Sequence, residues 1–97
     1  MDPPKLLCLN KLYHPNITQK GKVCLPLVRE DFSPTVTLTS IICGLIYILT
    51  YPNGEDALNT HIGDLMNKDY EMFKKIVEYT IEGRSFNNLE YDRIKIE

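Results

Sequence analysis

The stretch from Tyr13 to Arg29 contains the residues whose types and spacing could do chemistry. It carries His14-Pro15-Asn16, a bend at Gly21, and then Cys24 among apolar neighbours. Proline lacks an N–H and keeps the preceding residue extended, so the triplet belongs to a loop rather than to a helix. Glycine tolerates positive φ and supplies the second bend. The pattern predicts a thiol nucleophile with an amide side chain near it, held by a rigid loop.

The three cysteines, Cys8, Cys24 and Cys43, differ in setting. A lone cysteine among apolar residues is usually an inert core residue, and this is how we interpret Cys8 and Cys43. Cys24 differs because it lies in the loop, where a thiolate could both attack and leave near neutral pH. The odd number without paired spacing favours a reducing compartment over a disulfide framework. Because Cys8, His14 and Cys24 lack short paired spacings, we expect no metal site.

His14-Pro15-Asn16, with Cys24 ten positions after His14 and Phe32-Ser33-Pro34 farther on, resembles the ubiquitin-conjugating enzyme family. The resemblance continues downstream through Thr37-Leu38-Thr39, Pro52-Asn53, Glu55-Asp56 and Leu58-Asn59. Three short segments are most similar to the branch that conjugates the Nedd/Rub-type modifier: Arg29-Glu30-Asp31-Phe32, Ser40-Ile41-Ile42 and Gly44-Leu45. The resemblance implies an α+β fold. It matches the C-terminal two-thirds of that fold: its last sheet strand, active-site loop, central buried helix and C-terminal helices.

The resemblance implies a transferase that carries a modifier as a thioester on Cys24 and passes it to a substrate lysine. The modifier would be of the Nedd/Rub type, or otherwise ubiquitin. Partners would be an activating enzyme in an ATP-dependent pathway, a RING-type ligase and the substrate, with no cofactor bound. The alternative is a catalytically inactive, truncated or variant binding module that keeps the helices for docking.

Two polar residues of the loop have two readings each. Asn16 is either a turn residue that holds its own loop, or, as the family implies, also a donor to the oxyanion formed when lysine attacks. Removing one such donor costs about 10²–10³ in rate in other enzymes. His14 is either half of a Cys–His pair or, as the resemblance implies, a structural residue whose ring bonds loop backbone.

Further positions carry weaker signals. Asp56 is either a solvated surface residue or, as the resemblance implies, the carboxylate that orients the incoming lysine and helps it lose its proton. Pro15, Tyr13 and Leu58 would support the active-site loop, although packing explains Tyr13 and Leu58 equally well. Ser33-Pro34-Thr35 is either an ordinary turn or the loop that RING-type ligases contact.

The sequence departs from the family's usual pattern at three positions. Phe32 replaces the family's usual Trp. Gly54 and Ala57 replace its usual prolines, and the loss of these prolines predicts a looser loop around Asp56.

Several elements must position these residues. Apolar residues on both faces predict that Lys5–Leu12 is a central strand, and Pro26–Phe32 could form one helical turn. Thr37 is a plausible N-cap for a helix to about Thr50, and apolar side chains around its whole circumference predict that it is buried. Tyr51-Pro52-Asn53-Gly54 should end this helix, and Asn59 can cap another short helix. A further start signal around Asn67 to Asp69 predicts a helix over 67–82 that ends before Gly83. The tail, 84–97, should dock through its apolar residues: Phe86, Leu89, Tyr91, Ile94 and Ile96.

Length and composition limit the possible functions. The 97 residues predict one domain, 1–97. The resemblance implies that this domain is an incomplete ubiquitin-conjugating core, because the family's first helix and three strands precede the matching part. A net charge of −2 without a basic cluster argues against nucleic acid as the main ligand. Ile41–Leu49 is too short to span a membrane, which needs about 20 apolar residues. We expect a cytoplasmic or nuclear protein.

Overall fold

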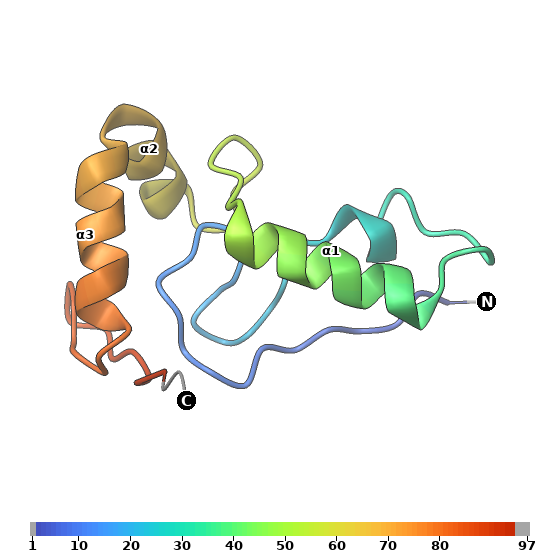
Figure 1. The fold of residues 1–97 in the computed structure, drawn as a ribbon, viewed down its shortest axis with the longest axis horizontal. Helices are drawn as coiled ribbons and strands as arrows, with labels where there is room; N and C mark the ends of the chain where they lie inside the picture. Colours follow the sequence, from blue (N-terminus) through green and yellow to red (C-terminus); the bar gives the residue numbers. More distant parts are fainter. Residues whose placement is uncertain (1, 95–97) are drawn as a thin grey trace.

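The computed structural model describes residues 2–94, and three α-helices dominate it (Figure 1). A short 3₁₀ turn, η1 (Pro26–Val28), precedes α1 (Leu38–Thr50), and α2 (Thr60–Lys68) and α3 (Tyr70–Thr80) follow. In Figure 1, α1 crosses the middle of the molecule, while α2 and α3 form a packed pair at one end. In Figure 1 the N-terminal segment runs below α1 as an irregular chain, whereas η1 is drawn above α1, and Cys24 lies shortly before η1 in the chain.

The predicted helix starts are confirmed by their capping contacts. The Thr37 side chain accepts a hydrogen bond from the Ser40 N–H, and Ser40 returns one to Thr37, so α1 begins with a capping box. Asn59 caps α2 through the Ile62 N–H, and Asp69 caps α3 through the Met72 N–H. Local side chains satisfy the first free N–H groups of each helix, which is why the sequence alone could predict them.

Helix α3 is shorter than the predicted 67–82. Asp69 separates it from α2, and it ends at Thr80 with Ile81 as the C-cap. Gly83 has φ +89° and its N–H donates to the Thr80 carbonyl, which confirms it as the terminator. The predicted turn over Pro26–Phe32 is present as η1 over its first three residues.

The prediction of a regular strand over Lys5–Leu12 is wrong for the described residues. The segment forms one isolated bridge, between Leu7 and Lys22, and two backbone hydrogen bonds. The Cys8 N–H donates to the Gly21 carbonyl at 2.8 Å, and the Lys11 carbonyl accepts the Asp92 N–H at 2.9 Å. A strand needs a neighbour along its whole length, whereas here a turn reaches it at Cys8 and the tail reaches it at Lys11. Leu6 and Cys8 pack toward the core, whereas Leu7 and Leu9 are 66% and 86% exposed.

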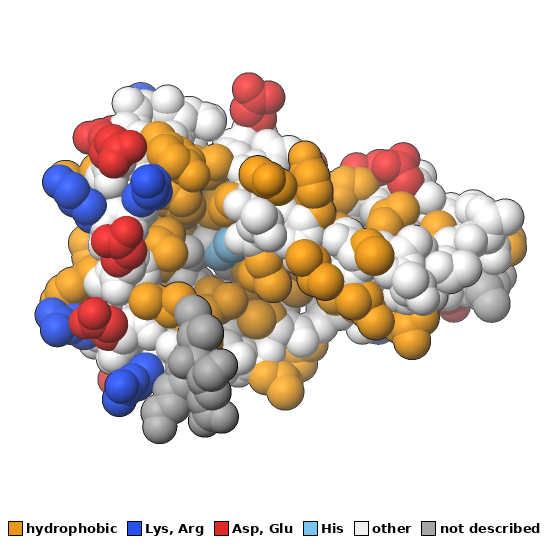
Figure 2. All heavy atoms as spheres, in the orientation of Figure 1, with side chains coloured by type: hydrophobic (Ala, Val, Ile, Leu, Met, Phe, Trp, Pro, Cys, Tyr) orange, Lys and Arg blue, Asp and Glu red, His pale blue; other side chains and the backbone are white. Residues whose placement is uncertain are grey.

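Helix α1 is also less buried than predicted. Only Ile41 and Ile48 are buried, and much of its remaining apolar surface faces outward: Leu38, Ile42, Ile46, Tyr47 and Leu49. Cys43, which we expected inside a buried helix, is exposed as well. Figure 2 shows hydrophobic side chains across the middle of the molecule, where α1 runs, and mixed charges over α3. The apolar pattern was real, but among residues 2–94 only one face of α1 finds a partner.

Two clusters hold the described residues together. In the first, the loop residues Ile17, Val23 and Leu25, together with Val28 of η1, pack against Ile41 of α1. Gly44 permits the close approach, since a Cβ there would lie 3.2 Å from the side chains of Leu25 and Leu27. In the second cluster, the rings of Phe73, Phe86 and Tyr91 surround Tyr13 with centroid distances of 5.7–6.0 Å.

Most of the described tail docks as predicted, whereas Leu89, which was also expected to dock, is 42% exposed. Tyr91 is buried, the Asp92 N–H donates to the Lys11 carbonyl at 2.9 Å, and the Ile94 N–H donates to the Ile81 carbonyl at 2.9 Å. Ile96, also expected to dock, lies outside the described residues. Within the described part, no helix combines the length and the apolar character that crossing a membrane requires.

Candidate active site around Cys24

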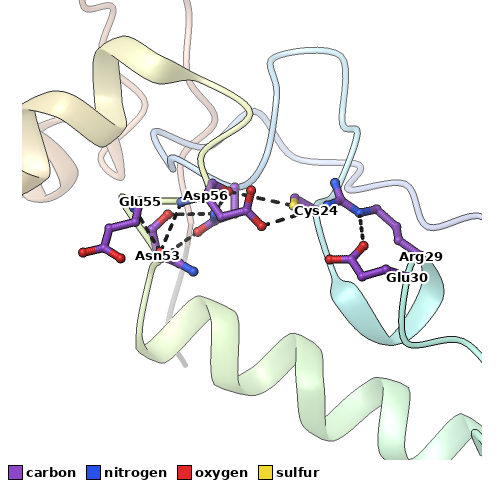
Figure 3. A network of polar contacts seen from close by, with 7 residues as sticks. Cys24, Arg29, Glu30, Asn53, Glu55 and Asp56 are labelled. Atoms are coloured by element: carbon purple, nitrogen blue, oxygen red, sulfur yellow. Dashed lines mark hydrogen bonds and ion pairs between the residues drawn. The ribbon is translucent and has the colours of Figure 1, made fainter.

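Cys24 lies in the loop just before η1, and its backbone is fixed. Val23 forms an isolated bridge with Ile17, and the Cys24 N–H donates to the Asn16 carbonyl at 2.9 Å. The residue is only 3% exposed. Its Sγ lies 4.0 Å from the main-chain oxygen of Asp56, which comes from the loop after α1 (Figure 3). The structure therefore brings together the thiol and two of the predicted residues, Asn16 and Asp56, from distant parts of the chain.

Asn16 is the link between the two loops. It is 1% exposed, and its amide group makes three hydrogen bonds to the segment after α1. Nδ2 donates to the carbonyls of Asn53 and Asp56, at 2.9 and 3.1 Å, while Oδ1 accepts from the Asn53 N–H at 2.8 Å. This side chain therefore fixes the height of the Asp56 loop above Cys24.

The hydrogen bonds of Asn16 bear on its two predicted readings. Both Nδ2 hydrogens are donated to carbonyl oxygens of the loop after α1, so the structure shows the interactions that the structural role of Asn16 requires. Donation to an oxyanion would require one of these two bonds to be exchanged for the substrate. The longer bond, to Asp56, joins the residue that lies beside the thiol, and it is the one that a reacting group would compete for.

His14 is occupied by backbone on both sides of its ring. Nε2 lies 2.9 Å from the Ile48 carbonyl in α1, and Nδ1 accepts the Asn16 N–H at 3.0 Å. Because a carbonyl can only accept, Nε2 carries the proton and the ring is neutral. Burial lowers the pKa of His14 from its ordinary value, in agreement with a neutral ring. Neither ring nitrogen is left to take a proton from Cys24.

Asp56 is positioned by a turn that Asn53 builds. The Asn53 side-chain oxygen accepts the N–H groups of Glu55 and Asp56, at 3.0 and 3.3 Å, in an Asx-type turn. The carboxylate of Asp56 itself is exposed. Sequence reasoning missed the role of Asn53, although an Asn that follows Pro52 and precedes Gly54 is a recognisable turn signal.

The predicted looseness of this loop does not fit its packing. An added Cβ on Gly54 would lie 2.6 Å from the Asn67 side chain and 3.0 Å from the Gly63 carbonyl, both in α2. Gly63 is equally tight, since its Cβ would lie 2.7 Å from that of Ala57. The small residues in place of prolines therefore let α2 pack directly on the loop, which stiffens it in another way.

Arg29 is the second residue that the sequence did not reveal. Its guanidinium pairs with Glu30 at 3.2 Å and lies 4.0 Å from the Asp56 carboxylate (Figure 3). Burial raises the pKa of the Cys24 thiol, and the cation of Arg29 is the largest influence that lowers it again. Nothing in the local pattern places this arginine near the thiol, because it is the turn through η1 that brings the chain back.

The remaining predicted residues lie farther from the thiol's contacts. Tyr13 belongs to the aromatic cluster with Phe73, which agrees with its packing role, and burial raises its pKa. Pro15 is fully buried and its carbonyl accepts the Asn59 N–H at the start of α2. Leu58 is half-buried between Asp56 and that helix.

Ser33-Pro34-Thr35 forms a turn between η1 and α1. The Ser33 and Thr35 hydroxyls lie 2.7 Å apart, and the Val36 N–H donates to the Ser33 carbonyl. Pro34 and Thr35 are exposed, so the turn is available to a partner. Among residues 2–94, no three His, Cys, Asp or Glu side chains gather in a way that could hold a metal ion.

Comparison with known proteins adds the context of this site. The sequence model of the family described as ubiquitin-conjugating enzyme matches residues 1–81. The chain is 43% identical to the NEDD8-conjugating enzyme UBC12 of Saccharomyces cerevisiae, across 97% of this chain and 50% of that protein. It is 38% identical to the Nedd8-conjugating enzyme UbcE2M of Drosophila melanogaster, across 84% of this chain and 45% of that protein.

A solved structure agrees with these sequence relatives. The chain superimposes on S. cerevisiae Ubc12 with a TM-score of 0.90 at 43% identity, covering 96% of this chain and 49% of that one. The predicted α+β fold is therefore confirmed, as the part of it that this chain spans. The chain spans about half the length of the curated relatives that it matches.

Proposed function

Because this chain belongs to the ubiquitin-conjugating enzyme family, we propose that it carries a Nedd/Rub-type modifier as a thioester on Cys24 and transfers it to a substrate lysine. One observation supports the proposal most directly. The Cys24 N–H donates a hydrogen bond to the Asn16 carbonyl, and the Asn16 side chain donates one to the Asp56 carbonyl, which holds the Asp56 loop next to the thiol. Similarity to proteins named as NEDD8-conjugating enzymes favours that modifier over ubiquitin.

Loading of Cys24 would be an exchange of one thioester for another. The Cys24 thiol loses its proton, its sulfur attacks the modifier's C-terminal carbonyl, and the activating enzyme's cysteine leaves as a thiolate. The pKa of Cys24 is raised by burial even with Arg29 nearby, so little thiolate forms at neutral pH until a docked partner stabilises it. The nearly buried thiol is protected from other electrophiles between these events.

Transfer would follow when a lysine amine attacks the same carbonyl, so that an amide bond forms, the C–S bond to Cys24 breaks, and Cys24 leaves as a thiolate. The amine must be neutral to attack, and an adjacent carboxylate can take its proton. Asp56 is exposed and lies on the loop whose main chain reaches the thiol, so it is available to the incoming amine. The negative oxygen that develops in this step needs a donor, for which the Asn16 amide group is the neighbouring candidate.

An activating enzyme, a RING-type ligase and a substrate protein would be the partners of this cycle. The exposed Ser33–Thr35 turn is the ligase-contact candidate. The turn follows η1 and Arg29 in the chain, and the Arg29 guanidinium lies 4.0 Å from the Asp56 carboxylate. A ligand on the turn could therefore shift Arg29, and with it the electrostatic environment of Cys24.

A loading assay tests the proposal. The protein is mixed with a Nedd/Rub-type modifier, its activating enzyme and ATP, and an adduct that disappears on reduction is expected. Cys24→Ala should abolish the adduct, Cys24→Ser should give a reductant-resistant ester, and Cys43→Ser, the matched control at an exposed thiol, should load normally. An adduct that persists in Cys24→Ala would refute the assignment. A folded protein that loads nothing would favour the inactive binding module.

A further inference from the structure

A groove beside the site gathers positive charge on a chain that is acidic as a whole. It has a volume of about 560 Å³, and four of its nine lining residues are basic: Lys5, Lys20, Lys22 and Arg29. No acidic residue lines it. The chain has 11 Lys and Arg against 13 Asp and Glu, a net charge of −2, so the remainder of the chain carries −6.

The groove is built on a fixed turn rather than on free side chains. The Gly21 N–H donates to the Thr18 carbonyl at 2.9 Å, and the Lys22 N–H donates to the Thr18 hydroxyl at 3.0 Å. Gly21 has φ +91°, and an added Cβ would lie 2.4 Å from the Cys8 carbonyl, so only glycine permits this approach. Lys20 and Lys22 therefore leave a turn that is pressed against the N-terminal segment.

The lysines have no counter-charge of their own. Among residues 2–94, the ion pairs within 4.0 Å involve Arg29 and Arg84, and none involves Lys5, Lys20 or Lys22. Three positive charges thus face solvent around a floor that includes the 66% exposed side chain of Leu7. A ligand that fits both features has carboxylates alternating with apolar side chains.

The groove is next to the thiol along the chain. Lys22 and Val23, which line it, directly precede Cys24, and Arg29 approaches the Asp56 loop at 4.0 Å. A peptide whose lysine reached Cys24 would place its neighbouring residues here. No aromatic residue lines the groove, so it lacks the stacking platform that single-stranded nucleic acid uses.

We propose that this basic groove binds an acidic, partly apolar stretch of the substrate protein that flanks the target lysine. The proposal rests on the proposed function and specifies its substrate class. Carboxylates of the flanking stretch pair with Lys5, Lys20 and Lys22, and its apolar side chains cover Leu7. The groove then selects lysines in acidic surroundings and holds them near the thiol.

Peptide binding to the unloaded chain tests the inference. The probe is a fluorescent 12-residue peptide with one lysine followed by alternating Glu and Val, and the control peptide has Gln in place of Glu. Lys20→Gln combined with Lys22→Gln should weaken binding of the Glu peptide about tenfold, since exposed charge pairs contribute up to about 1 kcal/mol each. Lys74→Gln combined with Lys75→Gln on α3 removes the same charge elsewhere and should leave binding unchanged.

Three results would overturn the inference: no preference for the Glu peptide, equal loss in both double variants, or equally tight binding of an oligonucleotide of the same charge. Binding needs no modifier, so it fails independently of Cys24 loading. Peptide binding without any loading would refute the proposed function while leaving the groove as an acidic-peptide site. When both hold, discharge to the Glu peptide should exceed discharge to the Gln peptide, and the Lys20/Lys22 double variant should remove that difference.

Discussion

Replacing Asn16 with alanine tests whether this side chain holds the two halves of the site together. The change removes three side-chain hydrogen bonds and leaves the Asn53 N–H and the carbonyls of Asn53 and Asp56 without these partners. Each such bond contributes about 1 kcal/mol net, so we expect a loss of about 3 kcal/mol. Domains of this kind are stable by about 5–15 kcal/mol, which makes the loss a large fraction of the total.

The assay is urea unfolding, with hydrogen exchange of the Cys24 and Asp56 amides as a local readout. Asn10→Ala is the matched control, because Asn10 is exposed and only its backbone carbonyl takes part in a described hydrogen bond. It should change stability by less than about 0.5 kcal/mol. Asn16→Asp keeps the acceptor but turns a carboxylate oxygen toward two carbonyls, so it should be less stable than Asn16→Ala at neutral pH and recover on acidification. If Asn16→Ala unfolds like the Asn10 control, the reasoning fails.

Three further predictions concern protons at the site. Asp56→Ala should slow discharge to free lysine by about 10²-fold in single-turnover assays while loading changes little; equal slowing of both steps would leave Asp56 a structural residue. Arg29→Gln should shift the loading rate to higher pH, because Arg29 lowers the pKa of the Cys24 thiol, whereas Arg84→Gln should not. Because burial lowers the pKa of His14, stability should fall below pH about 6.5 by up to about 1.4 kcal/mol per unit; urea titrations in which His14→Gln keeps the same slope would contradict this.

The parts of the fold that the sequence predicted are those determined locally. Thr37, Asn59 and Asp69 cap their helices through residues three positions away, so the pattern is visible in a short window. The spacing of His14 to Cys24 likewise identified the loop, because the turn chemistry of proline, asparagine and glycine is encoded in the residues themselves.

The parts that it did not predict depend on distant partners. Apolar residues around α1 indicated burial, yet which face is covered depends on what packs there, and most of Ile42 to Leu49 faces outward in the described structure. Arg29 and Asn53 reach the site through turns whose direction no local pattern specifies. Gly54 suggested a flexible loop, whereas contact with α2 makes it a close-packed one.

Mapping the attachment site of the modifier tests the central claim most directly. The loaded protein would be trapped before discharge, digested under non-reducing conditions, and analysed by mass spectrometry for the residue that carries the modifier's C-terminus. Cys24 is nearly buried, while Cys43 is exposed on α1 and offers an accessible competing thiol. The account predicts that the thioester lies on Cys24. Attachment to Cys43, or to Cys8, would contradict it.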